Sequence, residues 1–184
     1  MNPKHLVFCA ALALAGMATT GSALAQVPPV AAPDQLALLK SDSPKEAVNK
    51  KLVFDMYRAI VQGGHTEMAE QYFTPGYIQH NPNVASGRDE LVKYIKKTRP
   101  VRELKPLLDF PVISIMADGD MVLIAVVSWD DDPEKPGQRY ASTHFDLYRI
   151  ENGKIAEHWD HVPKSKAAQS FDPNVGSKEK VPAK

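Results

Sequence analysis

The dipeptide Asn152-Gly153 constrains the fold of this chain more than any other feature of its sequence. It lies inside the run D-L-Y-R-I-E-N-G-K-I-A-E-H-W-D, residues 146–160, between two stretches rich in apolar residues. Both residues of a tight hairpin turn need positive φ, which asparagine and glycine tolerate. A two-residue turn here predicts an antiparallel hairpin that pairs Ile150 with Ile155. Pairing continued outward gathers groups suited to proton transfer or metal binding: His144, Asp146, His158, Asp160 and His161.

The register of this hairpin decides which side chains share a face. In an unbulged hairpin Phe145 opposes Asp160 and Leu147 opposes His158, and the two polar residues share one face because they are two positions apart. Apolar neighbours would desolvate the Asp160 carboxylate and favour a raised pKa, which suits a general base. The other face would carry His144, Asp146, Glu157, Trp159 and His161. A single β-bulge would move part of one set across, so the sequence leaves open which set lines a pocket.

A metal is a weaker interpretation of the same residues. His144, His161 and Asp146 would supply two histidines and one carboxylate, a known metal-binding combination. Paired surface histidines are commoner than metal sites, and Cys9 is the one cysteine of the chain. We therefore expect neither a metal nor another cofactor.

A second polar motif, Y-I-Q-H-N-P, occupies residues 77–82. Tyr77, Gln79, His80 and Asn81 place donors and acceptors consecutively on what reads as an extended segment. The motif is either part of a binding site or local turn chemistry, since Asn-Pro-Asn favours a turn.

Together, Y-I-Q-H-N-P-N-V-A-S-G-R-D-E-L (77–91) and Y-R-I-E-N-G-K-I-A-E-H-W-D (148–160) resemble the SnoaL-like polyketide cyclase family of the nuclear-transport-factor-two-like superfamily. The resemblance covers roughly residues 45–162. It implies a cone-shaped fold, a homodimer, and an aspartate acid/base on the last strand, for which Asp160 is the match. It also implies that residues 77–81 lie at the pocket mouth, where His80 or Asn81 could hydrogen-bond a substrate carbonyl.

The pattern along the chain predicts an α+β fold, with three N-terminal helices over a curved antiparallel sheet that encloses a pocket. Apolar residues recur at helical spacing after a capping box at Ser43. The expected helices are 44–62, 66–73 and 87–98, and the expected strands are 112–117, 121–129, 139–150 and 155–162. The domain would span 43–163, between a flexible lead-in (26–42) and a flexible C-terminal tail (164–184).

Residues 1–25 read as a signal peptide, with a short basic start, an apolar run and a small-x-small site ending at Ala25. This predicts an exported protein, periplasmic or secreted, whose mature form lacks cysteine. The chain has 22 basic and 22 acidic residues. Such a balance gives no electrostatic footprint for nucleic acid, or for a membrane after signal removal.

The predicted function is cofactor-free proton transfer on a small apolar carbonyl compound, of the aldol cyclisation, isomerisation or dehydration type. Asp160 would remove a proton next to a carbonyl, while His80, Asn81 or His158 stabilises the enolate oxygen. The expected substrate contacts are Tyr77, Asn81, His144, Asp146 and Trp159, although Trp159 also fits a core or interface position. The alternative is a non-catalytic binding module for a small apolar ligand.

Overall fold

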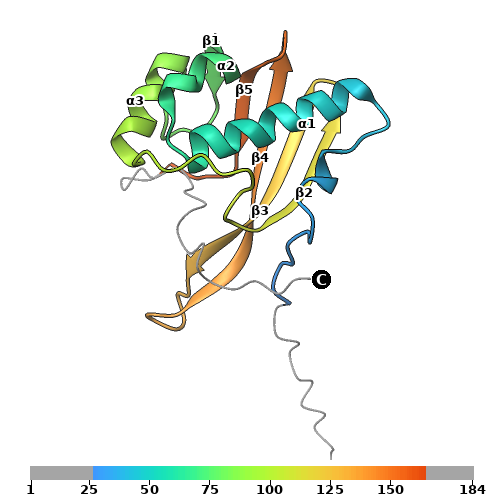
Figure 1. Ribbon diagram of the computed structural model, residues 1–184. Helices are drawn as coiled ribbons and strands as arrows, with labels where there is room; N and C mark the ends of the chain where they lie inside the picture. The colour runs from blue at the N-terminus through green and yellow to red at the C-terminus, as the bar shows by residue number, and fades with distance from the viewer. Residues whose placement is uncertain (1–26, 165–184) are drawn as a thin grey trace, which may run out of the picture.

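The computed structural model describes residues 27–164, in which helices cover one side of a curved sheet (Figure 1). The helices are α1 (Pro44–Met56), α2 (Ala69–Tyr72) and α3 (Arg88–Thr98). The strands are β1 (Phe73–Gln79), β2 (Val112–Asp118), β3 (Met121–Asp131), β4 (Arg139–Glu151) and β5 (Lys154–Asp160). The predicted α+β class is confirmed.

The helical run that starts with α1 begins and ends as the sequence predicts. Ser43 caps it by accepting a hydrogen bond from the backbone N–H of Glu46, which satisfies a donor that the first turn leaves unpaired. After Met56 the helix widens into a π-helical segment, Tyr57–Gln62. It stops at a glycine pair, where Gly64 has φ +68° and an added Cβ would lie 2.7 Å from the Pro100 carbonyl oxygen.

The five strands follow the order β1-β5-β4-β3-β2. Neighbours from β2 to β5 are antiparallel, whereas β1 pairs in parallel with β5. The sheet is therefore mixed rather than wholly antiparallel, because the Y-I-Q-H segment leaves α2 as an edge strand. This pairing places Gln79 opposite His158.

The β4–β5 hairpin contains the bulge that decides the register. The turn forms as predicted, with φ of 50° at Asn152 and 73° at Gly153, and Ile150 pairs with Ile155. The register then shifts by one residue at Ala156. The predicted unbulged pairings are therefore wrong. The observed partners are Asp146 with Asp160, Leu147 with Trp159, Tyr148 with His158 and Arg149 with Glu157.

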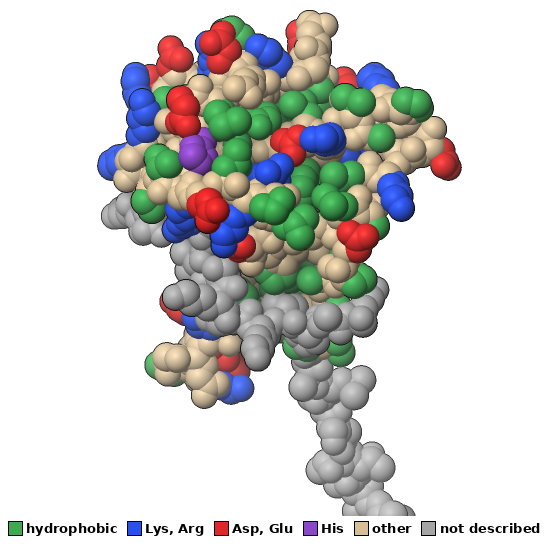
Figure 2. All heavy atoms as spheres, in the orientation of Figure 1, with side chains coloured by type: hydrophobic (Ala, Val, Ile, Leu, Met, Phe, Trp, Pro, Cys, Tyr) green, Lys and Arg blue, Asp and Glu red, His purple; other side chains and the backbone are tan. Residues whose placement is uncertain are grey.

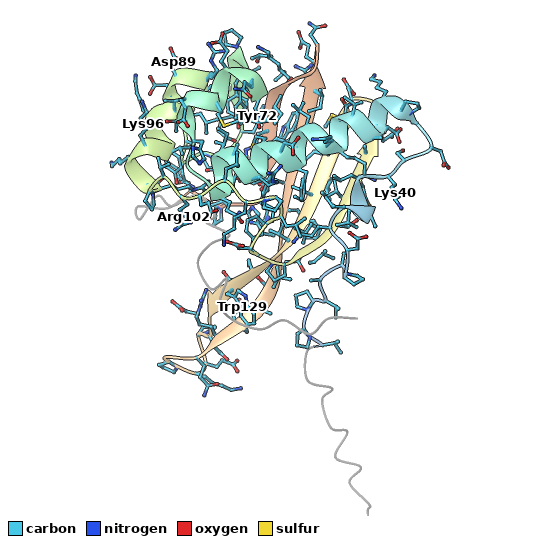
Figure 3. All side chains as sticks on the ribbon, in the orientation of Figure 1. Lys40, Tyr72, Asp89, Lys96, Arg102 and Trp129 are labelled. Carbon is cyan, nitrogen blue, oxygen red and sulfur yellow. The ribbon has the colours of Figure 1, made fainter. Side chains whose placement is uncertain are left out.

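The hydrophobic core lies between the helices and the concave side of the sheet. Buried members from the helical layer include Phe54 and Tyr57, and those from the sheet include Val126 and Ile155. Figure 2 shows apolar side chains between charged ones on the outer face over α1. The β3–β4 ribbon extends beyond the helical layer and carries Trp129 (Figure 3).

The segment before α1 has more contacts than its expected flexibility suggests. The Ala32 N–H donates to the Val112 carbonyl oxygen at 2.8 Å. The Gln35 side chain hydrogen-bonds both the N–H and the carbonyl of Leu108. The expected signal peptide and residues 165–184 of the expected tail lie outside the described residues. Between residues 27 and 164, no helix has the length and hydrophobicity needed to span a membrane.

Candidate active site

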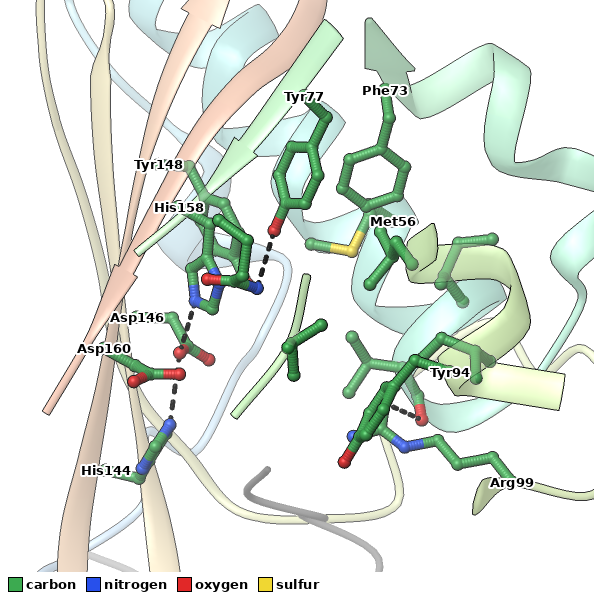
Figure 4. A pocket seen from close by; sticks show the side chains of 16 residues that line it. Met56, Phe73, Tyr77, Tyr94, Arg99, His144, Asp146, Tyr148, His158 and Asp160 are labelled. Atoms are coloured by element: carbon green, nitrogen blue, oxygen red, sulfur yellow. Dashed lines mark hydrogen bonds and ion pairs between the residues drawn. The ribbon is translucent and has the colours of Figure 1, made fainter. Parts of the chain in front are cut away.

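A cavity opens between the helical layer and strands β4 and β5 (Figure 4). Its polar floor is formed by side chains of β1, β4 and β5: Gln79, His144, Asp146, His158 and Asp160. Its other walls are Met56, Ile60, Val61, Phe73, Tyr77, Val84, Leu91, Tyr94, Ile95, Arg99 and Tyr148. Its free volume is about 60 Å³. A cavity needs a free volume of roughly 10–15 Å³ to hold one water molecule. The cavity is therefore larger than a water site, but it suits only a compact ligand.

Asp146 is the centre of the polar floor. Its Oδ1 lies 2.8 Å from His158 Nε2 and 3.1 Å from His144 Nε2, and its Oδ2 accepts a hydrogen bond from the Tyr57 hydroxyl. Burial opposes ionisation of this carboxyl, but the two histidines outweigh burial and hold its pKa well below the usual range. Asp146 is therefore a permanent anion that orders the site, not a base.

The orientation of His158 is fixed through Gln79. The Gln79 Oε1 accepts from the Asn81 backbone N–H at 3.0 Å, which identifies the amide oxygen. His158 Nδ1 lies 2.9 Å from this oxygen and must donate to it. Its Nε2 faces the Asp146 carboxylate and donates there. Both ring nitrogens therefore carry protons, and His158 with Asp146 forms a buried ion pair.

Asp160 has a different environment from Asp146. Its Oδ2 accepts from Asn81 Nδ2 at 2.6 Å and its Oδ1 from the Val162 backbone N–H at 3.1 Å. It lies opposite Asp146 and lines the cavity. Each Asp160 oxygen retains acceptor capacity, since a carboxylate offers about four lone-pair directions. The predicted candidate base therefore faces the cavity.

Tyr77 supplies a hydroxyl proton to the same cavity. Its oxygen accepts from Gln79 Nε2 at 3.0 Å, and its own O–H donates to none of residues 27–164. Burial, together with the negative charges of Asp146 and Asp160, raises the pKa of Tyr77 well above its usual value. Tyr77 is therefore a neutral donor, and the residue is only 2% exposed.

Two predicted site residues lie on the opposite face of the sheet. His80 stacks on Trp159 with ring centroids 4.7 Å apart, and its Nε2 lies 3.1 Å from Glu157 Oε2. The hydrogen bond from His80, followed by that from Arg149, lowers the pKa of Glu157. Neither residue lines the cavity that Asp146 and Asp160 share, because side chains alternate along each strand. The catalytic role of His80 and the substrate contact of Trp159 stay predictions.

The structure brings most of the remaining predicted residues together. Tyr77, His144, Asp146, His158 and Asp160 line one cavity, and Asn81 holds Asp160. His161 is not paired with His144 across the strands as expected, although their ring centroids lie 4.7 Å apart.

The bulge also changes which groups could bind a metal. Within the described chain, Asp146, His158 and Asp160 each offer a ligand atom, all within 4.8 Å of one another. This set differs from the His144–Asp146–His161 combination considered above. His158 and Asp146 already hydrogen-bond each other, so a metal would have to displace that proton.

Three residues with a role in or next to the cavity were not predicted. Tyr57 belongs to the apolar stripe of a helix, and only the π-helical widening and Asp146 reveal its polar role. Gln79 was noted beside Tyr77 without a role, and the β1–β5 pairing gives it one. Arg99 ends a lysine-rich helix and gave no signal, yet it is buried against the cavity.

The comparison with protein families is specific. The SnoaL-like domain matches residues 53–158 of this chain. No match to a curated protein was found.

Several solved structures resemble this one. A protein assigned as a polyketide cyclase from Acidithiobacillus ferrooxidans is 20% identical, with 66% of this chain and 89% of that chain covered and a TM-score of 0.46. TsrD from Streptomyces laurentii is 21% identical, with 62% and 87% covered and a TM-score of 0.42. An LEH-like epoxide hydrolase of M. tuberculosis is 13% identical, with 61% and 80% covered and a TM-score of 0.45. Such distant likenesses do not determine the reaction of this chain. The domain match covers more than half of the sequence, and the chain belongs to the SnoaL-like domain family.

Proposed function

We propose that this protein catalyses proton transfer at a carbon next to a carbonyl group, with Asp160 as the base. One observation carries the proposal: Asp160 shares a small, largely apolar cavity with Tyr77, whose hydroxyl oxygen accepts from Gln79 and whose hydroxyl proton is donated to none of residues 27–164. A base and a hydrogen-bond donor in such a site are what enolisation requires.

In the proposed step, an Asp160 oxygen takes the proton from the carbon, and the electron pair moves onto the carbonyl oxygen. Tyr77 donates its hydrogen bond to that oxygen as negative charge develops there. Asn81 holds the base in place through its 2.6 Å hydrogen bond to Oδ2. Return of the proton from Asp160 to the same carbon gives exchange, and its delivery to another carbon gives isomerisation. Where the substrate carries a hydroxyl group on the β-carbon, the proton can go to that oxygen, the C–O bond breaks and water leaves, which gives dehydration.

His158 has an electrostatic role in this proposal. Both of its N–H groups are committed, to Gln79 and to Asp146, so it does not donate to the substrate oxygen. Its positive charge offsets Asp146, so that Asp160 does not face an uncompensated carboxylate. We assign His158 and Gln79 as positioning residues.

The size of the cavity restricts the substrate. Pockets for drug-sized ligands measure roughly 300–1,000 Å³, whereas the free volume here is about 60 Å³. We infer that the substrate is a compact carbonyl compound rather than a long polyketide.

The test needs no knowledge of the natural substrate. Small ketones, such as 2-pentanone and cyclopentanone, are incubated with the protein in D₂O, and deuterium uptake next to the carbonyl is followed by proton NMR. Wild-type protein should accelerate uptake above buffer, and Asp160→Asn should not. No acceleration with any compact ketone would refute the proposed reaction.

The second candidate is a binding module without catalysis. It is favoured by one observation: Asp146 and both nitrogens of His158 are already hydrogen-bonded within the protein. Saturable ketone binding without deuterium uptake would identify this function.

We further propose that the protein is an exported homodimer. The outer face of β4 and β5 has a shallow, mainly apolar depression lined by Phe145, Leu147 and Trp159, with Asp160 and His161 at its polar end, and Phe145 is 47% exposed. Exposed apolar patches of this kind mark partner surfaces, and a second copy can bury the same patch on both subunits. Export rests on the leader-like sequence of residues 1–25.

A further inference from the structure

A buried cation lines the cavity on the side away from the carboxylates. Arg99 directly follows α3 and is 8% exposed. In Figure 4 it lies with Tyr94 on one side of the cavity, whereas Asp146 and Asp160 lie on the other. Its Nη1 donates to the Val61 carbonyl oxygen at 3.2 Å, which helps to fix the guanidinium at the cavity wall.

The chemistry of this side chain favours one kind of guest. A guanidinium keeps its charge at all ordinary pH values and presents five N–H donors in a planar fork that matches a carboxylate. Partial exclusion of water strengthens its attraction for an anion in the same cavity. The proton-transfer step assigns Arg99 no role, and the residue lines the same cavity as the proposed base.

We propose that Arg99 binds a carboxylate group of the substrate, which makes the substrate class compact keto acids. This assignment rests on the proposed function, which places the carbonyl at Tyr77 and Asp160. The short hydrocarbon part would then pack against the apolar wall formed by Leu91 and Ile95. The polarity of the cavity orients the guest: the carboxylate is attracted to Arg99 and repelled by Asp160.

Matched acid and amide probes test the subsite directly. We would titrate 4-oxopentanoate, 5-oxohexanoate and their primary amides into ¹⁵N-labelled protein and measure Kd by NMR. The acid and amide have nearly the same shape, and only the acid is charged at pH 7. Wild-type protein should bind at least one acid about tenfold more tightly than its amide, as a charge-assisted bidentate pair predicts. Equal affinities for acid and amide would overturn the proposal.

A matched pair of arginine variants locates the effect. Arg99→Met removes the charge and keeps a long side chain, so the preference for the acid should disappear. Arg102 is the control because its Nη1 also points to a carbonyl of the same helical segment, that of Gln62 at 3.5 Å, yet it is exposed and outside the cavity lining (Figure 3). Arg102→Met should keep the preference. Its loss in both variants, or in neither, would contradict the subsite.

A second measurement covers the case in which Arg99→Met fails to fold. In wild-type protein, the Arg99 Nε–H resonance should shift when 5-oxohexanoate is added and stay in place with the amide. A resonance unmoved by the acid at saturation would refute the contact.

The subsite and the reaction can fail separately. Asp160→Asn should lose deuterium exchange while keeping the acid preference, because the base and Arg99 are distinct groups. Preference without exchange in the wild type would leave the subsite standing and remove the catalytic proposal. Deuterium exchange in the wild type without a preference for the acid would leave the catalytic proposal standing and remove the Arg99 subsite.

Discussion

Asp146 and Asp160 face each other across β4 and β5 as directly paired residues, yet their surroundings differ sharply. Two histidines and a tyrosine surround Asp146, whereas an amide and a backbone N–H bind Asp160. The first carboxylate is held as a fixed anion and the second retains lone pairs toward the cavity. This asymmetry assigns different tasks to two chemically identical groups.

Asp160→Asn should lower the rate of deuterium exchange about 10²–10⁴-fold, the usual contribution of a general base. The change creates no cavity, but it puts an NH₂ group where an oxygen now accepts from Asn81 or Val162. The free energy of unfolding should therefore fall by only about 1–2 kcal/mol. The control is Glu157→Gln on the outer face, which should leave the rate near wild type. The exchange rates of the two variants are measured by NMR. A larger loss in Glu157→Gln than in Asp160→Asn would show that the chemistry takes place on the outer face of the sheet.

Tyr77→Phe removes the proposed donor to the developing enolate oxygen. The exchange rate should fall about 10²–10³-fold, as when one oxyanion donor is deleted. The ring packing against Phe73 is retained, since their centroids lie 5.0 Å apart in an edge contact. Tyr140→Phe, at a partly exposed residue outside the cavity, is the matched control. Equal rates in Tyr77→Phe and wild type would exclude the donor role.

Asp146→Asn should destabilise the fold by about 3–5 kcal/mol at pH 7, because it leaves His158 charged and buried without its partner. The pKa of Asp146 is lowered in the folded protein. Its contribution to stability is therefore complete above the unfolded-state pKa of about 3.9 and declines as pH falls below it.

Urea unfolding of wild type and Asp146→Asn at several pH values checks this expectation. The stability difference between the two proteins should shrink below about pH 4. A difference that grows on acidification would contradict the ion pair.

Phe145→Asp should convert the proposed dimer to monomer at micromolar concentration, because two carboxylates would meet in an apolar contact. Light scattering measures the mass. Met116→Asp is the control, at an exposed residue of β2 that lies outside the depression. A wild-type mass equal to one chain would refute the dimer.

The exported protein should begin at Gln26, since small residues precede it in the pattern of a cleavage site. Mass spectrometry of the secreted or periplasmic protein tests this. Recovery of the exported chain with Met1 intact would refute cleavage.

The sequence predicts the elements of this fold better than their register. The Asn152-Gly153 turn is correct because its chemistry is local. The bulge at Ala156 depends on how the strand packs over its whole length, and its only local trace is two consecutive buried apolar residues, Ile155 and Ala156. That one extra residue moves His158 and Asp160 onto the same face as Asp146.

Roles that depend on distant partners were the hardest to predict. Asp160 was predicted from its motif. His80 was expected at the pocket mouth, but the sequence does not indicate the parallel pairing of β1 with β5, which sets Gln79 opposite His158 and His80 against Glu157. Arg99 and Tyr57 sit in helical patterns that a core alone would explain. Only the three-dimensional arrangement shows that the first lines the cavity and the second binds Asp146.

The parallel pairing of β1 with β5 sets the order in which this site can form. The hydrogen bond between Gln79 and His158 joins residues 79 positions apart, and β5 ends the described sheet. During synthesis, β1 with Gln79 therefore has no partner strand until β5 has been made. Long-range closures of this kind slow folding, so a truncated or stalled chain would carry an apolar cavity without its floor.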